Sequence, residues 1–242
     1  MTTPRDATLP AARSMTFFFH RQGVHVVLLV LLVSVAYALA KPKLATSAWR
    51  GSGDESFLGL TALGWFWLNA ALVVVHQAVV ALVFRGQLGW GVLTRLFGRR
   101  DMLVWGVIFM PFLIARPLVI AGLAIADAGT LDLPRWLSVS LGSVLLAPAV
   151  YAGYSVARFF GIPRALGGDH FRLLYRQMPM VRDGAFAWTP NAMYLIVFLG
   201  LWAIALLAGA YLALVAALFQ HAYIWVHYWC TEEPDMRLMY ES

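Results

Sequence analysis

The last third of the sequence carries a run of aromatic side chains that ends in carboxylates. His221, Trp225, Tyr228 and Glu232 are spaced i, i+4, i+7 and i+11, so they share one face of a helix. Aromatic faces attract cations, and a carboxylate accepts hydrogen bonds from ammonium or hydroxyl groups. The stripe could therefore line a ligand site, although Trp and Tyr are as typical of a membrane interface.

The acidic pair Glu232 and Glu233 has two interpretations. It can begin a helix, with Thr231 as the N-cap and Pro234 in the first turn, or it can belong to a ligand site. The residue types alone favour the helix start, and both interpretations stay open.

Polar residues upstream of the stripe could complete a site. Gly184 precedes Asn191 and Tyr194, and Asn191 offers both a donor and an acceptor. His170 is a candidate general base, although a solvated loop histidine is the commoner case. His221 and His227 are six residues apart and do not share a helix face, so we expect no metal site.

Two ionisable residues, His76 and Arg116, lie within apolar runs. Such groups inside a membrane are candidates for substrate contact because exposure to lipid is costly. Arg116 could instead extend toward the interface or pair with a structural partner.

The composition requires a membrane around these residues. Hydrophobic residues make up 61% and charged residues 12% of the 242, with a mean hydropathy of +0.73. We expect the bilayer as a partner. We expect no nucleic acid, because the 18 basic residues lie mainly in short loops between apolar runs.

Apolar runs predict an all-α polytopic membrane helix bundle in a single domain, residues 1–242. Residues 191–230 contain no charged side chain, yet one helix of that length would reach about 60 Å, twice the hydrocarbon core. We therefore predict a C-terminal helical hairpin that reverses at residues 207–210. The six predicted spans are residues 25–40, 57–84, 102–125, 136–160 and the two arms of the hairpin.

Basic residues predict the orientation of the bundle. The two termini and the loops 85–101 and 161–190 contain 12 Lys and Arg, and the opposite side contains four. The positive-inside rule then predicts cytoplasmic N- and C-termini.

Motifs in residues 165–240 resemble the isoprenylcysteine carboxyl methyltransferase and phospholipid methyltransferase superfamily. The family pattern is Gly-x-Tyr, then Arg-His-Pro-x-Tyr, a hairpin and Glu-Glu. Here Gly184 is followed by Phe186 in place of Tyr, Tyr194 closes the middle motif, and Glu232 opens the acidic pair. Asn191 occupies the position of the family histidine.

The resemblance implies S-adenosylmethionine as cofactor and a membrane lipid as substrate. We expect a phospholipid amine head group, with an isoprenylcysteine carboxylate as the alternative. An NADPH-dependent sterol-type reductase and a transporter or lipid scaffold remain alternatives of other classes. The residues given these roles are, for the cofactor, Gly184, Asn191, Tyr194, His221, Trp225, Tyr228 and Glu232, for catalysis Glu233 and His170, and for the substrate Arg116 and His76.

Overall fold

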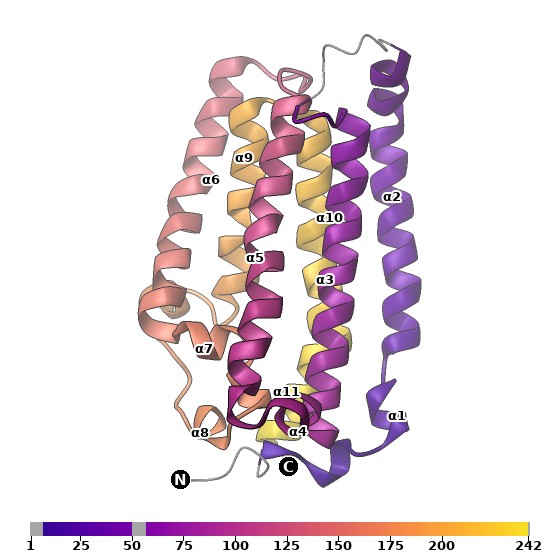
Figure 1. Ribbon diagram of the computed structural model, residues 1–242. Coiled ribbons are helices and arrows are strands. Elements are labelled where there is room, and N and C mark those ends of the chain that lie inside the picture. Colours follow the sequence, from indigo (N-terminus) through magenta and orange to yellow (C-terminus); the bar gives the residue numbers. More distant parts are fainter. Residues whose placement is uncertain (1–6, 50–56, 242) are drawn as a thin grey trace.

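The computed structural model describes residues 7–49 and 57–241. Helices make up 82% of the structure, and no strand occurs within the described ranges. The predicted all-α membrane bundle is confirmed. Long helices run side by side along the bundle, and both ends of the chain lie at the same end of it, here called the terminal end (Figure 1).

Six helices build the body of the bundle. Four described segments are apolar and long enough to cross a membrane, namely Met15–Lys43, Ala62–Trp90, Val92–Ala126 and Arg135–Phe160. The hairpin helices are shorter. The six are α2 (Gln22–Trp49), α3 (Ala62–Trp90), α5 (Asp101–Ala126), α6 (Arg135–Ser155), α9 (Leu199–Ala208) and α10 (Tyr211–His227).

The boundaries of α3 differ from the prediction by about one and a half turns. The Thr61 side chain accepts a hydrogen bond from the Gly64 amide and caps the helix there, rather than at Phe57. The helix continues past Phe84 to Trp90 because Arg85 and Gln87 are buried against protein rather than solvated in a loop.

The predicted hairpin is confirmed at the expected place. Helix α9 ends at Ala208 and α10 begins at Tyr211, with Gly209 at φ 63° and ψ 40° between them. This left-handed conformation favours glycine. Asp127 at the end of α5 accepts a hydrogen bond from the Leu212 amide at 2.6 Å, which fixes the start of α10.

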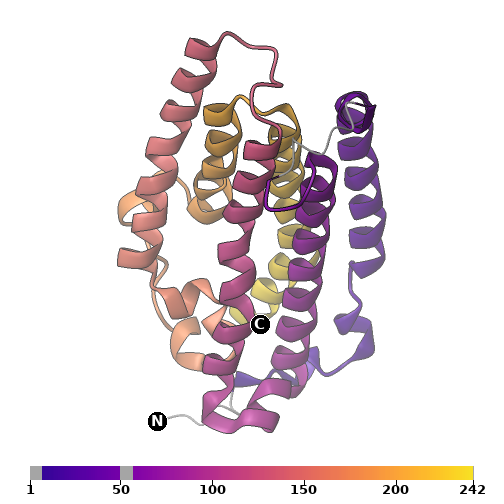
Figure 2. The ribbon, with the colours of Figure 1, turned by 45° about the horizontal axis from the view of Figure 1, so that its top comes forward.

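Helix α10 is the central element. It packs against α2, α3, α5 and α9, while α2 and α6 lie at opposite edges of the bundle (Figure 2). Alanines such as Ala205, Ala213 and Ala217 are fully buried in the largest apolar cluster. Small residues let helix backbones approach closely, which is the usual basis of helix association in membranes.

Short helices gather at the terminal end (Figure 1). They bring polar residues from distant parts of the sequence under the central helices. They are α1 (Met15–Phe18), α4 (Val92–Phe97), α7 (Ile162–Ala165), α8 (Leu173–Arg176) and α11 (Glu233–Tyr240).

Candidate active site

Tyr194 and Glu232 meet below the hairpin. The Tyr194 hydroxyl donates a 2.5 Å hydrogen bond to Oε2 of Glu232. The Tyr194 ring lies edge-on to the rings of Trp225 and Tyr228, with centroids 6.1 and 5.9 Å away, and those two rings are 5.8 Å apart. The structure therefore brings together four of the residues that the sequence singled out. We call these four the Tyr194 cluster.

Tyr194 and Glu232 each lie in a π-helical turn. Tyr194 is in the turn Met193–Val197, and Glu232 ends the turn Tyr228–Glu232 that follows α10. A π turn accommodates an extra residue and is frequent at functional sites. It also changes which residues share a face, so regular α-helical spacing could not give the orientation of Glu232 beyond this turn.

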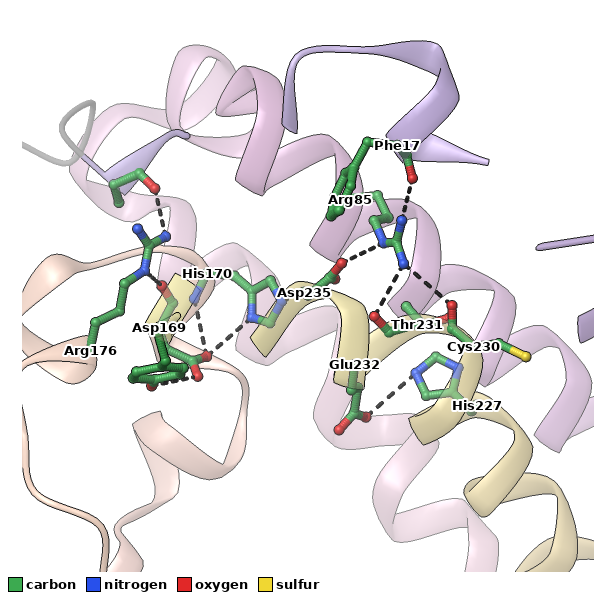
Figure 3. Close-up of polar contacts among 12 residues, drawn as sticks. Phe17, Arg85, Asp169, His170, Arg176, His227, Cys230, Thr231, Glu232 and Asp235 are labelled. Atoms are coloured by element: carbon green, nitrogen blue, oxygen red, sulfur yellow. Dashed lines mark hydrogen bonds and ion pairs between the residues drawn. The ribbon is translucent and has the colours of Figure 1, made fainter. Parts of the chain in front are cut away.

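Glu232 has a second partner in His227. Its Oε1 is 3.5 Å from Nε2 of His227, which is fully buried (Figure 3). This contact lacks hydrogen-bond geometry, and neither ring nitrogen of His227 has a hydrogen-bond partner among the described residues. Glu232 lies beyond the last residue of α10. Burial raises the pKa of its carboxyl group, and the hydrogen bond from Tyr194 offsets part of this rise, which leaves the pKa at about 7.

Glu233 forms its ion pairs with arginines outside the Tyr194 cluster. Its carboxylate forms ion pairs of 2.5 Å with Arg21 and with Arg237. The hydrogen bond from Arg21 is the main reason why the pKa of Glu233 lies below its usual value. The two adjacent glutamates therefore have different environments. The pKa of Glu232 is about 7, whereas Arg21 keeps Glu233 ionised.

Gly184 packs against residues at the end of α6, and Asn191 precedes the turn that carries Tyr194. Gly184 has a φ of 61°, and a Cβ there would lie 2.5 Å from Oγ of Ser155 and 2.8 Å from Phe159. The Asn191 carbonyl accepts the Tyr194 amide at 3.0 Å, while its side chain forms no hydrogen bond within the described ranges. Gly184 thus allows close packing on α6, and Asn191 leads into the turn that carries Tyr194.

His221 lies farther along α10. Its Nδ1 accepts a 3.1 Å hydrogen bond from the Trp202 indole on α9, and its ring is 5.4 Å from that of Phe198. This environment belongs to the hairpin. The expected cofactor role of His221 stays a prediction.

A buried ion-pair network around Arg85 and Asp235 lies next to Glu232 in the fold. The sequence did not indicate this network. Nε of Arg85 is 2.6 Å from Oδ1 of Asp235, and both side chains are almost completely buried (Figure 3). Arg85 also donates to the backbone carbonyls of Cys230 and Thr231 at 3.3 and 3.2 Å, and to that of Phe17. The network therefore holds the turn that presents Glu232.

His170 joins the same network from the segment after α7. Its Nε2 is 3.3 Å from Oδ2 of Asp235, its Nδ1 is 3.1 Å from Oδ1 of Asp169, and its ring stacks on Phe84 at 4.0 Å. Burial lowers the pKa of His170, but the hydrogen bonds with Asp169 and Asp235 outweigh it and raise that pKa to about 9. His170 is therefore protonated at neutral pH.

Two signals could have located this network. Arg85 directly follows a long apolar run, where continuing the helix would bury it, and Asp235 follows the acidic pair by two residues. Neither signal shows that Arg85 pairs with Asp235, because the two residues are 150 positions apart in the sequence.

The remaining predicted residues, Arg116 and His76, lie in the interior between α3, α5 and the hairpin. Arg116 is 4% and His76 is 3% exposed. The Arg116 guanidinium lies 5.5 Å from the centroid of Phe198, and the His76 ring stacks on Phe112 at 5.1 Å. Within the described part of the chain neither contacts Glu232. Arg116 lies on α5 and His76 on α3, and we call these two residues the polar pair.

The fold and the site together define a membrane-embedded helix bundle with a polar site at one end. Residues 137–242 match the model of the phospholipid methyltransferase family, which is part of the superfamily that the motifs resemble. The matched region begins within α6 and contains every later element. No curated protein and no solved structure matches the chain. The match indicates a methyltransferase that lies in a membrane.

Proposed function

We propose that the protein is an integral membrane methyltransferase that uses S-adenosylmethionine to methylate a phospholipid amine head group. The observation that carries the proposal is the Tyr194 cluster, which combines a carboxylate with three aromatic rings inside the family-matched region. We place the cofactor region at residues 165–240 of a single membrane domain.

The donor set of the Tyr194 cluster fits this cofactor. Glu232 can accept hydrogen bonds from ammonium or ribose hydroxyl groups, and the faces of Trp225 and Tyr228 favour a sulfonium cation by about 0.5 to 2 kcal/mol. Asn191 adds a side-chain amide that has no partner in the described protein. S-adenosylmethionine supplies a methyl group on a sulfonium sulfur, which leaves as a neutral thioether when the acceptor nitrogen bonds to the methyl carbon.

An ammonium head group must first lose a proton, and Glu232 suits this step best. A general base works well when its pKa is near the working pH, and the pKa of Glu232 is about 7. His170 already holds a proton at neutral pH because its pKa is about 9. The pKa of Glu233 is lowered by Arg21, which makes this carboxylate a weak base. We therefore assign proton transfer to Glu232, and network roles to His170 and Glu233.

We also propose that the terminal end faces the cytoplasm. Both termini lie there (Figure 1), together with the two Arg-rich loops. A soluble cofactor of the cytoplasm would then reach the Tyr194 cluster directly. A reporter fused after Ser242 should be active in the cytoplasm, and activity only on the opposite side would contradict this orientation.

Ligand binding to the purified protein in detergent tests the cofactor. Calorimetric titration with S-adenosylhomocysteine should show binding, and titration with NADPH should not. Glu232→Gln and Tyr194→Phe should weaken the binding of S-adenosylhomocysteine, whereas Glu241→Gln, an exposed acid near the same end, should not. Binding of NADPH without any response to S-adenosylhomocysteine would overturn the proposal in favour of a reductase.

Transfer of a labelled methyl group tests the substrate. The protein should methylate phosphatidylethanolamine, and Glu232→Gln should lose more rate at pH 7 than at pH 9, where more of the amine is deprotonated without help. A carboxylate acceptor is ionised at both pH values and would show no such recovery. Methylation of a prenylcysteine analogue with phosphatidylethanolamine left unchanged would move the protein to the isoprenylcysteine branch.

A further inference from the structure

Arg116 is a buried cation for which the described residues provide no anionic partner. Its Nε and Nη2 form no hydrogen bond, and no carboxylate within residues 7–49 and 57–241 forms an ion pair with it. The nearest described aromatic face, that of Phe198, compensates only in part. An unpaired guanidinium inside a membrane bundle costs several kcal/mol, and a bound anion would offset that cost.

His76 supplies a second unpaired polar group to the same space. It comes from α3, which packs along α5, and it lies within electrostatic range of Arg116. Both of its ring nitrogens are buried and have no hydrogen-bond partner in the part of the chain that the structure describes. An imidazole N–H beside a guanidinium fork is a donor set for an oxyanion, and the planar fork matches phosphate oxygens especially well.

This polar pair adjoins the Tyr194 cluster. Tyr194 and Tyr223 both lie within electrostatic range of Arg116, and Tyr194 itself binds Glu232. Tyr223 precedes Glu232 by nine residues, about 13 Å of helix. An anion at Arg116 and a cation at Glu232 would therefore lie at different depths of the bundle, with Tyr194 near both.

We propose that Arg116 and His76 bind the phosphodiester of the substrate lipid and direct its amine toward Glu232. This inference rests on the proposed function and specifies the substrate as a zwitterionic phospholipid whose phosphate enters the bundle. The carboxylate of the cofactor shares the same anionic chemistry, and the experiment separates the two sources.

Binding of dioleoylphosphatidylethanolamine to purified variants in detergent, followed by native mass spectrometry, tests the proposal. Arg116→Met should weaken lipid binding about tenfold to hundredfold, as expected for loss of a charge-assisted hydrogen bond, and Arg116→Lys should weaken it less. The exposed Arg158, changed to Met, is the matched control and should bind lipid as the parent does. The affinity for S-adenosylhomocysteine should stay within about threefold in all variants.

Thermal unfolding of lipid-free protein provides a readout that a structural role would move in the opposite direction. Arg116→Met removes an unpaired buried charge, so its lipid-free midpoint should equal or exceed that of the parent, and added lipid should no longer raise it. Unchanged lipid affinity, a selective loss of S-adenosylhomocysteine binding, or a large fall in the lipid-free midpoint would each overturn the inference. Arg116-dependent lipid binding without methyl transfer would refute the proposed function alone.

Discussion

The buried pair of Arg85 and Asp235 makes a sharp prediction for Asp235→Asn. The side chains of both residues are 1% exposed or less, so the substitution leaves a guanidinium buried without a full countercharge and removes a carboxylate from His170. Removing one partner of a buried ion pair typically costs about 3 to 5 kcal/mol. At about 1.4 kcal/mol for each factor of ten, the opening equilibrium of this region should rise by about 10² to 10³ or more.

The single cysteine of the protein reports this opening. Cys230 is fully buried, and its carbonyl accepts a hydrogen bond from Arg85, so a thiol reagent reaches it only when the terminal end opens. When closing is faster than labelling, the labelling rate follows the opening equilibrium. Asp235→Asn should therefore label at least about a hundredfold faster than the parent at the same pH.

Two variants complete the experiment. Asp132→Asn, an exposed acid between α5 and α6, should label at the parent rate. The double variant Arg85→Met with Asp235→Leu should recover much of the protection, because it removes both charges instead of leaving one unpaired. Labelling of Asp235→Asn at the parent rate would show that the pair does not stabilise the terminal end, and the reasoning from burial would be wrong.

Two further predictions concern stability. Because the pKa of His170 is raised from 6.5 to about 9, its contribution of about 3 kcal/mol is complete below pH 6.5 and is lost as the pH rises through 9. The parent unfolding midpoint should fall by about 6 to 12 °C between pH 6.5 and 9.5, and that of His170→Gln should fall much less. Gly184→Ala should destabilise by about 1 to 3 kcal/mol, because its φ is 61° and its Cβ would meet Ser155. Gly153→Ala on α6, where a Cβ meets no atom within 4 Å, should be neutral or slightly stabilising, as denaturation curves would show.

The bundle could be predicted from the sequence because membrane helices are encoded locally. An apolar run without charges must span or turn back, which placed the hairpin reversal within residues 207–210, and the structure turns there at Gly209. The end of α3 could not be placed in this way, since Arg85 looks like a loop residue until its partner is known. Its burial depends on Asp235, which only the folded chain brings near.

The sequence could predict which residues form the Tyr194 cluster, but not how their side chains are arranged. Aromatic and acidic residue types selected Tyr194, Trp225, Tyr228 and Glu232, and the contacts join all four. The different environments of Glu232 and Glu233 depend on the π turn and on Arg21, neither of which leaves a periodic signal.

The geometry of the site in the family-matched region depends on contacts from the first half of the chain. Residues 137–242 contain Glu232 and Asp235, but Arg85, which fixes the carbonyls just before Glu232, comes from α3. Arg21, which holds Glu233, precedes α2, and the unpaired Arg116 lies on α5. The apolar partners of α10 divide in the same way, because α2, α3 and α5 all lie before residue 137. The first half therefore supplies the cations, Arg85 and Arg21, that orient the acidic segment after α10.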